Sequence, residues 1–370
     1  MLYHLLAPLQ SIFGPFRLFR YVTFRGAMAG ALAIVLVLLL GPGLIRLVRR
    51  LQLGQNVREE VPASHRQKVG TPTMGGVLIL AAALLGILLF ADLGSARVLI
   101  GLGVLVALGA LGVWDDYVKV RGGRARGVNK RTKLLFQFLV AAGVGWLLYL
   151  LPADPALRTI TNLPLLEKVR VDFRWFYVPL VVVLIVGFSN AVNLADGLDG
   201  LAPSLLVMSF GGYAVLAYVA GALLTFGSYQ LRLADYLRIL YVPGAGEMAV
   251  YCLALAGACL GFLWFNAYPA QIFMGDTGSL PLGGALAFAA VVCKQELLLP
   301  LVGGVFVIEA VSVILQVVYF YATRGRRLFR MAPLHHHFEL KGWPEPKVVT
   351  RFTIVAALLS MLAVATLKVR

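Results

Sequence analysis

Apolar residues in this chain occur in long continuous runs, not in the short alternating pattern of a water-soluble domain. About 20 apolar residues form a helix long enough to cross a hydrocarbon core about 30 Å thick. Segments of this kind occur at 24–46, 74–91, 97–114, 134–151, 175–189, 201–222, 246–264, 280–294, 298–321 and 352–368. The pattern therefore predicts an all-α polytopic membrane protein with about ten transmembrane helices.

The composition agrees with this prediction. The chain is 60% hydrophobic and 14% charged, with a mean hydropathy of +0.86, whereas a soluble domain is about 45–50% apolar and about 25% charged. With no long soluble-like block, residues 1–370 are predicted to form a single integral-membrane domain. Residues 1–22 are predicted to form an interfacial helix, although Gly14-Pro15 interrupts them. The three cysteines lie in apolar segments without zinc-ligand spacing, so we interpret them as packing residues.

The formal charge of +16 is distributed unevenly along the chain. The loops after the first, third, fifth, seventh and ninth segments hold 20 of the 33 Lys and Arg residues. The positive-inside rule places that side in the cytoplasm and both termini outside. Membrane topology accounts for much of the charge, and anionic substrates or lipids would account for more. We therefore expect no nucleic-acid partner.

The chemically unusual stretches all lie in loops of the predicted cytoplasmic side. In chain order they are "SHRQKVGTPTMGG", "WDDY", "NAVNLADGLDG", "NAYPAQIFMGDTGS" and "MAPLHHHFELKGWPEP". The opposite loops offer little comparable, for example "ADLGSAR" and "KQE". This segregation predicts an active site on the cytoplasmic face.

Three aspartates are the first candidates for chemistry. Asp115 and Asp116 end a segment at its C-terminus, where the helix dipole disfavours a carboxylate by about 0.3–1 kcal/mol. Two carboxylates at this position are expected to have a compensating cation or a functional role, unless they form a solvated end of the helix. Asp276 stands after Gly275 and before Gly278. Its hard oxygen suits Mg²⁺, and the glycines allow backbone N–H groups to approach a phosphate.

Polar residues at two further boundaries join these aspartates. Asn190, Asn193, Asp196 and Asp199 recur every three residues, which spreads them over about half of an α-helix or aligns them on a 3₁₀ turn. Polar groups so dense at a membrane boundary are costly unless they are wet or liganded, although a plain polar cap is the alternative.

Histidine, lysine and aromatic residues complete the candidates. The consecutive residues 335–337 are all His, and three neighbours cannot face one ion from a regular helix, so phosphate hydrogen bonding or loop stabilisation is favoured over zinc. Lys68 and Lys133 are candidate phosphate partners or solvated charges. Phe273 would stack a planar base or anchor the membrane interface. Carboxylates and phosphates repel unless a divalent metal bridges them. Together these residues predict Mg²⁺-assisted phosphoryl transfer between a cytosolic substrate and a lipid.

At these residues the chain resembles the phospho-N-acetylmuramoyl-pentapeptide transferases, which are polyprenyl-phosphate sugar-1-phosphate transferases of bacterial wall synthesis. The resemblance covers nearly the whole chain through "SHRQKVGTPTMGG", "DDY", "NAVNLADGLDGLA", "GFLWFNAYPAQIFMGDTGSL" and "MAPLHHHFELKGWPEP". The triple-His segment favours this branch over the N-acetylglucosamine-1-phosphate branch. One departure is Ala195, where the family usually has Thr.

The resemblance implies ten helices in the bacterial inner membrane, surrounded by membrane lipids, with Mg²⁺ dependence and commonly a homodimer. It implies the transfer of phospho-N-acetylmuramoyl-pentapeptide from UDP-N-acetylmuramoyl-pentapeptide to undecaprenyl phosphate, giving lipid I and UMP. Asp276 would be the Mg²⁺ ligand, and Asp115, Asp116 and His335 would be catalytic. The substrate-binding residues would be Lys68, Asn266, Phe273 and Asp199 at the nucleoside, Asn193, Asp196, Lys133, His336 and His337 at the sugar phosphate, and also Thr71, Asn190, Gly197 and Leu198.

Three alternatives remain open at this point. The sugar nucleotide could be UDP-N-acetylglucosamine. The reaction could run in two steps through a phospho-aspartate instead of one in-line displacement. A secondary transporter or lipid flippase would place its acids near the bilayer midplane on interrupted helices of an inverted repeat, and no such repeat is apparent in this sequence.

Overall fold

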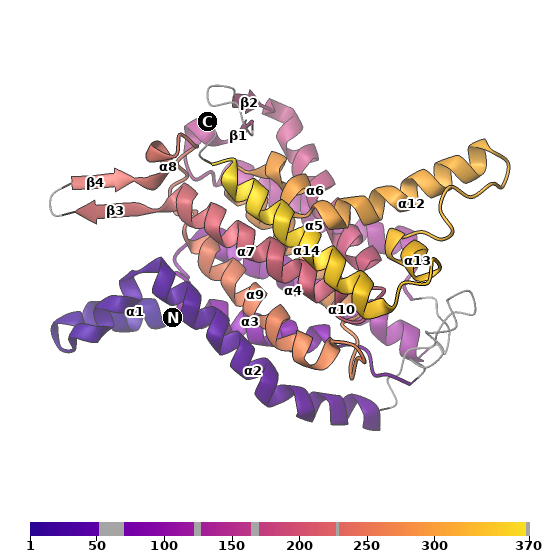
Figure 1. Ribbon diagram of the computed structural model, residues 1–370. Coiled ribbons are helices and arrows are strands. Elements are labelled where there is room, and N and C mark those ends of the chain that lie inside the picture. Colours follow the sequence, from indigo (N-terminus) through magenta and orange to yellow (C-terminus); the bar gives the residue numbers. More distant parts are fainter. Residues whose placement is uncertain (52–69, 122–126, 164–169, 227–228, 368–370) are drawn as a thin grey trace.

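The computed structural model describes residues 1–51, 70–121, 127–163, 170–226 and 229–367. These residues form a bundle of long helices with two small hairpins (Figure 1). Eight helices are long and apolar enough to cross a membrane, which confirms an all-α polytopic membrane protein. They are α2 (Val22–Arg50), α4 (Ala96–Arg121), α5 (Lys130–Leu150), α6 (Tyr177–Ala195), α7 (Leu201–Gly221), α9 (Glu247–Asn266), α12 (Gly304–Ala322) and α14 (Glu345–Ala365).

Two further apolar helices are shorter. α3 (Gly76–Phe90) has 15 residues and α10 (Asp276–Val292) has 17, so α3 is about 22 Å long at 1.5 Å per residue. Each of the ten segments predicted from the sequence therefore contains a helix, but two of the ten fall short of a full span by length.

Helix α10 is the centre of the bundle. All of its residues are buried, and they are mostly Gly, Ala, Leu and Val, which allow neighbouring helices to approach closely. It packs against α4 and α6, while α7 and α9 pack against each other beside it. By contrast, only 22% of the most apolar stretch of α12 or of α14 is buried, against 78% for α9. The residue at the start of the central helix is Asp276.

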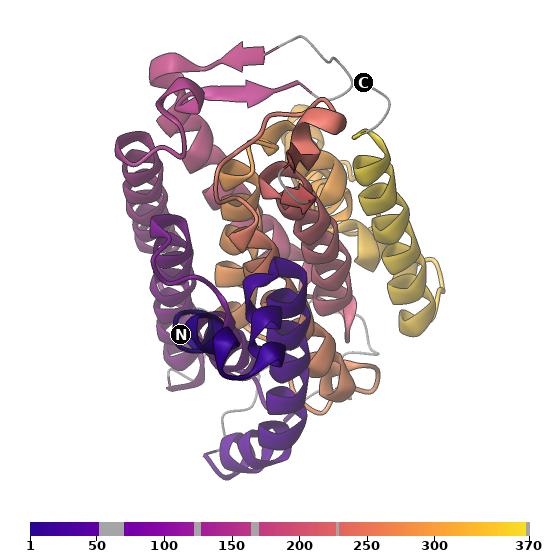
Figure 2. The same ribbon diagram turned by 90° about the vertical axis from the view of Figure 1, so that its left-hand side faces the viewer.

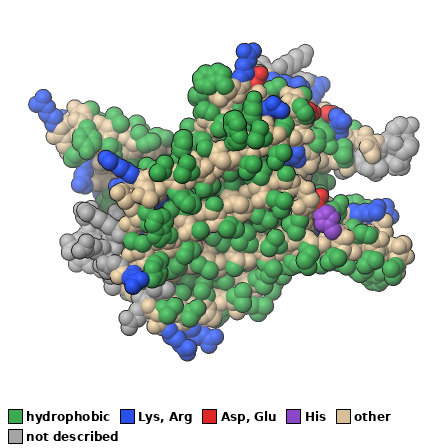
Figure 3. Space-filling view, turned by 180° about the vertical axis from the view of Figure 1, so that it is seen from behind, with side chains coloured by type: hydrophobic (Ala, Val, Ile, Leu, Met, Phe, Trp, Pro, Cys, Tyr) green, Lys and Arg blue, Asp and Glu red, His purple; other side chains and the backbone are tan. Residues whose placement is uncertain are grey.

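The peripheral helices turn their apolar side chains outward. Figure 3 shows hydrophobic side chains over most of one face, with Lys and Arg gathered toward the margins. Exposed large apolar residues are frequent on α2, α5, α12 and α14, including Leu39, Leu139, Ile314 and Met361. An apolar surface this extensive suits lipid and not water.

The two ends of the bundle differ in structure. One end holds the hairpin of β1 (Ile160–Asn162) with β2 (Arg170–Asp172) and that of β3 (Leu223–Phe226) with β4 (Tyr229–Arg232), both antiparallel. Figure 1 shows the β3–β4 hairpin at the left of the molecule and the β1–β2 hairpin at the top, and Figure 2 shows the molecule from its left-hand side. The other end holds the C-terminus of α4, the N-terminus of α10 and the short helix α13 (Leu334–Glu339).

Three sequence predictions need correction. The segment 298–321 is not one helix, because the 3₁₀ turn Glu296–Leu298 leads into α11 (Leu299–Val302) and α12 begins after Gly303. Residues 1–22 do not form one interfacial helix. They form α1 (Leu2–Leu6) and two 3₁₀ helices (Ala7–Ser11 and Gly14–Arg20) before α2 begins, as the break at Gly14-Pro15 allows. The third segment does not end at its aspartates, because α4 continues to Arg121.

Candidate active site

Asp276 is the first residue of α10, and the backbone before it takes an unusual conformation. Gly275 has φ 72° and ψ 179°, a region that side-chain-bearing residues rarely adopt. A Cβ added at Gly275 would lie 2.5 Å from Oδ2 of Asp116. On the facing helix, a Cβ at Gly112 would lie 2.3 Å from the Asp276 carbonyl. Both glycines let α4 and the start of α10 approach closely enough to bring their aspartates together.

Asp116 caps the N-terminus of α10 from a different helix. Its Oδ2 accepts hydrogen bonds from the backbone N–H of Thr277 at 2.9 Å and from the Thr277 hydroxyl at 2.7 Å, and its Oδ1 accepts from the backbone N–H of Asp276 at 3.2 Å. The first N–H groups of a helix lack partners within the helix, and the positive end of its dipole favours a carboxylate. Asp116 therefore holds α10 in register with α4.

Asp115 faces the lysines instead. Its Oδ1 accepts from the backbone N–H of Val128 at 2.9 Å, and Lys119 Nζ lies 2.6 Å from its Oδ2. Lys119 Nζ also lies 2.9 Å from Asp276 Oδ1, and Lys133 Nζ donates to Asp276 Oδ2. Both aspartates of α4 are 2% exposed, which rules out a solvated helix stop. The lysines bring two positive charges to three buried carboxylates.

The three carboxylates meet the geometric requirement for a metal site. Asp115, Asp116 and Asp276, which we call the carboxylate cluster, each offer an oxygen, and these oxygens lie within 4.8 Å of one another. Hard carboxylate oxygens are the protein ligands that Mg²⁺ and Ca²⁺ take. The donor set and its charge therefore fit a divalent cation, which the carboxylate cluster would hold.

The segment that follows the first predicted loop docks directly on this site. Backbone hydrogen bonds run from Phe273 N–H to Pro72 O, from Gly75 N–H to Phe273 O and from Gly76 N–H to Met274 O, each 2.8 Å long. Thr71 is half-buried at the start of this segment. The predicted residue Lys68 lies outside the described residues.

The Asn and Asp residues at the end of α6 divide between two tasks. Asn193 Nδ2 donates to Asp276 Oδ1 and to Ser279 Oγ, both at 2.8 Å, so it contacts the carboxylate cluster directly. Asn190 Nδ2 instead donates to Gln137 Oε1 at 2.9 Å and to Val186 O at 2.8 Å. Its amide nitrogen thus joins α5 to α6.

Asp196 lies in the turn after α6, near the cluster. Burial, together with the negative charges of Asp276 and Asp116, raises the pKa of Asp196 to about 7, while the hydrogen bond from the Gly275 N–H opposes the shift. Asp196 therefore titrates close to neutral pH.

The remainder of this turn is held by backbone contacts. Asp199 is 4% exposed, its backbone N–H donates to Glu345 Oε1 at 2.6 Å, and its Oδ2 accepts from Ala270 N–H at 3.0 Å. Asn266 is also buried, with Oδ1 accepting from Gly200 N–H and Nδ2 donating to Ile272 O. Leu198 is buried, and Phe273 is half-buried beside the docked segment.

The three histidines differ in their surroundings. His335 is fully buried, and its Nδ1 lies 3.1 Å from Glu309 Oε2 on α12, while its backbone N–H donates to Glu309 Oε1 at 3.2 Å. Its Nε2 is buried next to Gly197, where an added Cβ would come within 2.5 Å of it. His336 Nδ1 lies 2.7 Å from Glu339 Oε2, and His337 Nδ1 accepts from the backbone N–H of Arg330 at 3.1 Å.

Sequence reasoning missed several residues of the site. Lys119, Gln137 and Glu309 are not among the site residues predicted from the sequence. Glu309 had a usable signal, because an acid inside an apolar segment is rare and usually functional. Thr277 had no such signal in the sequence, since its hydroxyl reaches Asp116 only when α4 and α10 pack together.

Comparison with known proteins shows the family of this chain. The sequence profile of Glycosyl transferase family 4 matches residues 97–294, and the phospho-N-acetylmuramoyl-pentapeptide-transferase signature 1 matches residues 68–80. Proteins named phospho-N-acetylmuramoyl-pentapeptide-transferase are similar over 100% of both chains: 50% identical in Desulfosudis oleivorans, 51% in Desulfotalea psychrophila and 52% in Desulfatibacillum aliphaticivorans. The chain therefore belongs to the phospho-N-acetylmuramoyl-pentapeptide-transferase family.

Proposed function

We propose that this protein transfers phospho-N-acetylmuramoyl-pentapeptide from UDP-N-acetylmuramoyl-pentapeptide to undecaprenyl phosphate, giving lipid I and UMP in the first membrane step of peptidoglycan synthesis. The observation that carries the proposal is the carboxylate cluster, whose oxygens lie within 4.8 Å of one another at one end of a bundle of apolar helices. The full-length relatives bear the name of this transferase. We place the cluster at the cytoplasmic face of the bacterial inner membrane, with both termini outside, and we expect a homodimer.

The reaction would be a single in-line displacement. An oxygen of the lipid phosphate attacks the β-phosphorus of the UDP-sugar, the bond from that phosphorus to the bridging oxygen breaks, and UMP leaves with the electron pair. Mg²⁺ bound by the carboxylate cluster would supply charge neutralisation for the pyrophosphate. Because the second pKa of a phosphate is about 6, much of the lipid phosphate arrives without a proton.

The chain's own residues have distinct roles in this scheme. Asp115 accepts the remaining proton from the monoanionic lipid phosphate, or orients the dianion. Lys119 and Lys133, which contact Asp276 in the structure, turn toward phosphate oxygens when substrate binds. His335, held by Glu309, presents Nε2 beside the turn at Gly197 to the sugar phosphate. Asp199, Asn266 and Phe273 form the nucleoside side of the site, with Lys68 and Thr71 from the first loop.

The experiment supplies purified protein in detergent with undecaprenyl phosphate and either UDP-N-acetylmuramoyl-pentapeptide or UDP-N-acetylglucosamine, and measures UMP. We expect UMP only with the muramoyl substrate, and none without the lipid phosphate. Excess EDTA should stop the reaction and added Mg²⁺ should restore it. UMP release without membrane compartments would exclude a transporter, whereas turnover of the glucosamine nucleotide alone would refute the proposed substrate.

A further inference from the structure

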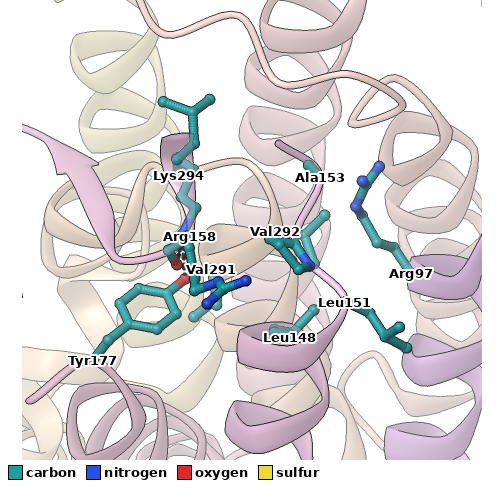
Figure 4. A pocket seen from close by; sticks show the side chains of 11 residues that line it. Arg97, Leu148, Leu151, Ala153, Arg158, Tyr177, Val291, Val292 and Lys294 are labelled. Atoms are coloured by element: carbon teal, nitrogen blue, oxygen red, sulfur yellow. Dashed lines mark hydrogen bonds between the residues drawn. The ribbon is translucent and has the colours of Figure 1, made fainter. Parts of the chain in front are cut away.

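A second group of charged side chains lies at the end of the bundle that carries the hairpins. A pocket there is bounded by the ends of α4, α5, α6 and α10 and by the loop after α5. Its lining includes Arg97, Arg158 and Lys294, which we call the cation cluster, together with Tyr177 and apolar residues such as Leu148 and Leu151. Figure 4 shows Arg158 beside the Tyr177 ring and Arg97 on the far side of the pocket. No carboxylate lines this pocket among the described residues.

The three cations are held by neutral groups. Arg97 donates to the carbonyl of Pro243, and the Arg158 guanidinium lies 5.0 Å from the centre of the Tyr149 ring. Lys294 Nζ donates to the Tyr177 hydroxyl at 2.7 Å and to the Arg158 carbonyl at 3.1 Å. Arg158 Nε is buried and has no hydrogen-bond partner within the described part of the chain. A donor that is buried without an acceptor costs about 1–3 kcal/mol, so this group favours a ligand that accepts from it.

One acid offsets part of this charge. The Tyr177 hydroxyl donates to Glu296 Oε1 at 3.2 Å, so Glu296 is linked to Lys294 through the tyrosine. Burial lowers the pKa of Lys294 to about 8, and Glu296 opposes that shift, so the lysine is still mostly protonated at pH 7. Among the described residues, one carboxylate is therefore linked to this group of three cations, of which Lys294 is buried and Arg97 and Arg158 are half-buried. Charge that is removed from water favours a counter-ion.

The pocket lies at the depth of a lipid headgroup. Trp146 and Tyr149 stack on each other on α5 one turn or less from Leu148, and Trp146 is 57% exposed. Trp175, in the 3₁₀ turn just before α6, is also exposed. Trp and Tyr gather where membrane helices meet the headgroup layer. The side chains of Leu147, Leu150 and Leu151 are exposed around the same turn, as expected for contact with acyl chains.

We propose that the cation cluster binds a phosphate-class anion, and that its source is the headgroup of an anionic phospholipid in the leaflet at the hairpin end. Arg158 and Arg97 would form charge-assisted hydrogen bonds with the phosphate oxygens. The acyl chains would lie along the exposed leucines of α5. This site is separate from the proposed transferase chemistry, which takes place at the other end of the bundle.

The test is native mass spectrometry of the purified full chain with phosphatidylglycerol or, in a parallel arm, phosphatidylcholine. We expect phosphatidylglycerol to be retained preferentially and Arg158→Gln to weaken its binding about fivefold, since a basic residue at a membrane surface is worth about 1 kcal/mol. Arg97→Gln should act in the same direction. The matched control is Arg174→Gln, which removes an exposed arginine near the first hairpin and should leave binding unchanged.

A third arm adds inorganic phosphate and measures the unfolding temperature. If phosphate stabilises the wild-type protein but not Arg158→Gln, while phosphatidylglycerol binds both equally, the source of the anion is free phosphate and the lipid assignment is overturned. If the control variant loses lipid as strongly as Arg158→Gln, or if the cluster variants lose no lipid and phosphate stabilises them as it stabilises the wild type, the site itself is refuted. UMP release by the variants serves as a measure of intact folding and is expected to match the wild type.

Discussion

The two ends of the bundle both bury charged side chains, but with opposite balance. The carboxylate cluster sets three acids against Lys119 and Lys133, and the opposing charges are in direct contact, with Lys119 Nζ 2.6 Å from Asp115 Oδ2. The cation cluster sets three cations against Glu296, and its charges contact carbonyls, rings and a hydroxyl instead. One end is therefore suited to a cation and the other to an anion.

The ends also differ in how firmly their charges are held. The side chains of Lys119 and Lys133 are 31% and 15% exposed, and both extend to carboxylates on another helix. Lys294 is 7% exposed and is tied to a tyrosine and a backbone carbonyl. Partly exposed lysines can exchange one anionic partner for another during a reaction. A buried lysine that donates to a tyrosine and a backbone carbonyl instead stabilises the fold.

The largest effect should come from Asp276→Asn. The substitution removes a carboxylate that contacts both lysines and would ligand the metal, and loss of several kcal/mol of transition-state stabilisation lowers kcat by about a thousandfold or more. UMP release measures it, and unchanged size-exclusion and melting profiles would show that the fold survives. Asp235→Asn, which changes an exposed aspartate of α8 (Leu233–Tyr236), is the control. A wild-type rate in the Asp276 variant would contradict the assignment.

Lys294→Met should lower the stability of the protein and leave its turnover nearly unchanged. It leaves the Tyr177 hydroxyl and the Arg158 carbonyl without their donor, at a cost of about 2 kcal/mol in the free energy of unfolding. The unfolding temperature should fall while kcat for UMP release stays within about twofold of the wild type. Lys347→Met at an exposed position is the matched control and should change neither. A large loss of turnover without loss of stability would show that the two ends are coupled.

Glu309→Gln should lower kcat/KM by about tenfold, the equivalent of about 1.4 kcal/mol. The amide keeps the shape but removes the charge that orients His335, so the presentation of Nε2 is weakened while the backbone contact remains. Ser312→Ala, which alters a buried residue one turn along α12, controls for disturbance of the helix. If the two variants lost activity equally, the effect would belong to the helix and not to the histidine.

The last prediction concerns the pH dependence of stability contributed by Asp196. An unfolded carboxyl ionises near its ordinary pKa of about 3.9, whereas burial and the neighbouring acids raise the pKa of Asp196 to about 7 in the folded chain. Between these values the folded chain keeps a proton that the unfolded chain has lost, so its stability falls as the pH rises from about 4 to about 7.

Asp196→Asn should remove this contribution. In EDTA, the unfolding temperature of the wild type should drop by at least about 2 °C more than that of the variant over this range. Thermal unfolding monitored by intrinsic fluorescence measures the difference. Parallel curves for the two proteins would mean that Asp196 does not gain a proton near neutral pH.

Much of this architecture could be predicted from the sequence because membrane helices require long apolar runs. The sequence did not predict which partner each of two adjacent residues contacts. Asp115 and Asp116 looked equivalent, yet one turns to Lys119 and the other caps α10, since neighbouring helical side chains point about 100° apart. The break at Gly303 was hidden because both of its flanks are apolar. Asn190 was predicted to bind substrate, and its amide nitrogen bonds Gln137 and a carbonyl of its own helix.

The complete burial of α10 has a consequence for how this protein responds to its bilayer. The peripheral helices α2, α12 and α14 meet the lipid, so they would absorb a change in hydrocarbon thickness by tilting, at a cost of fractions of a kcal/mol per Å. The helix that begins with Asp276 touches only protein and is fixed to α4 at its first turn. The end that carries Asp276 is thereby insulated from membrane thickness, and turnover should vary little between short-chain and long-chain lipids.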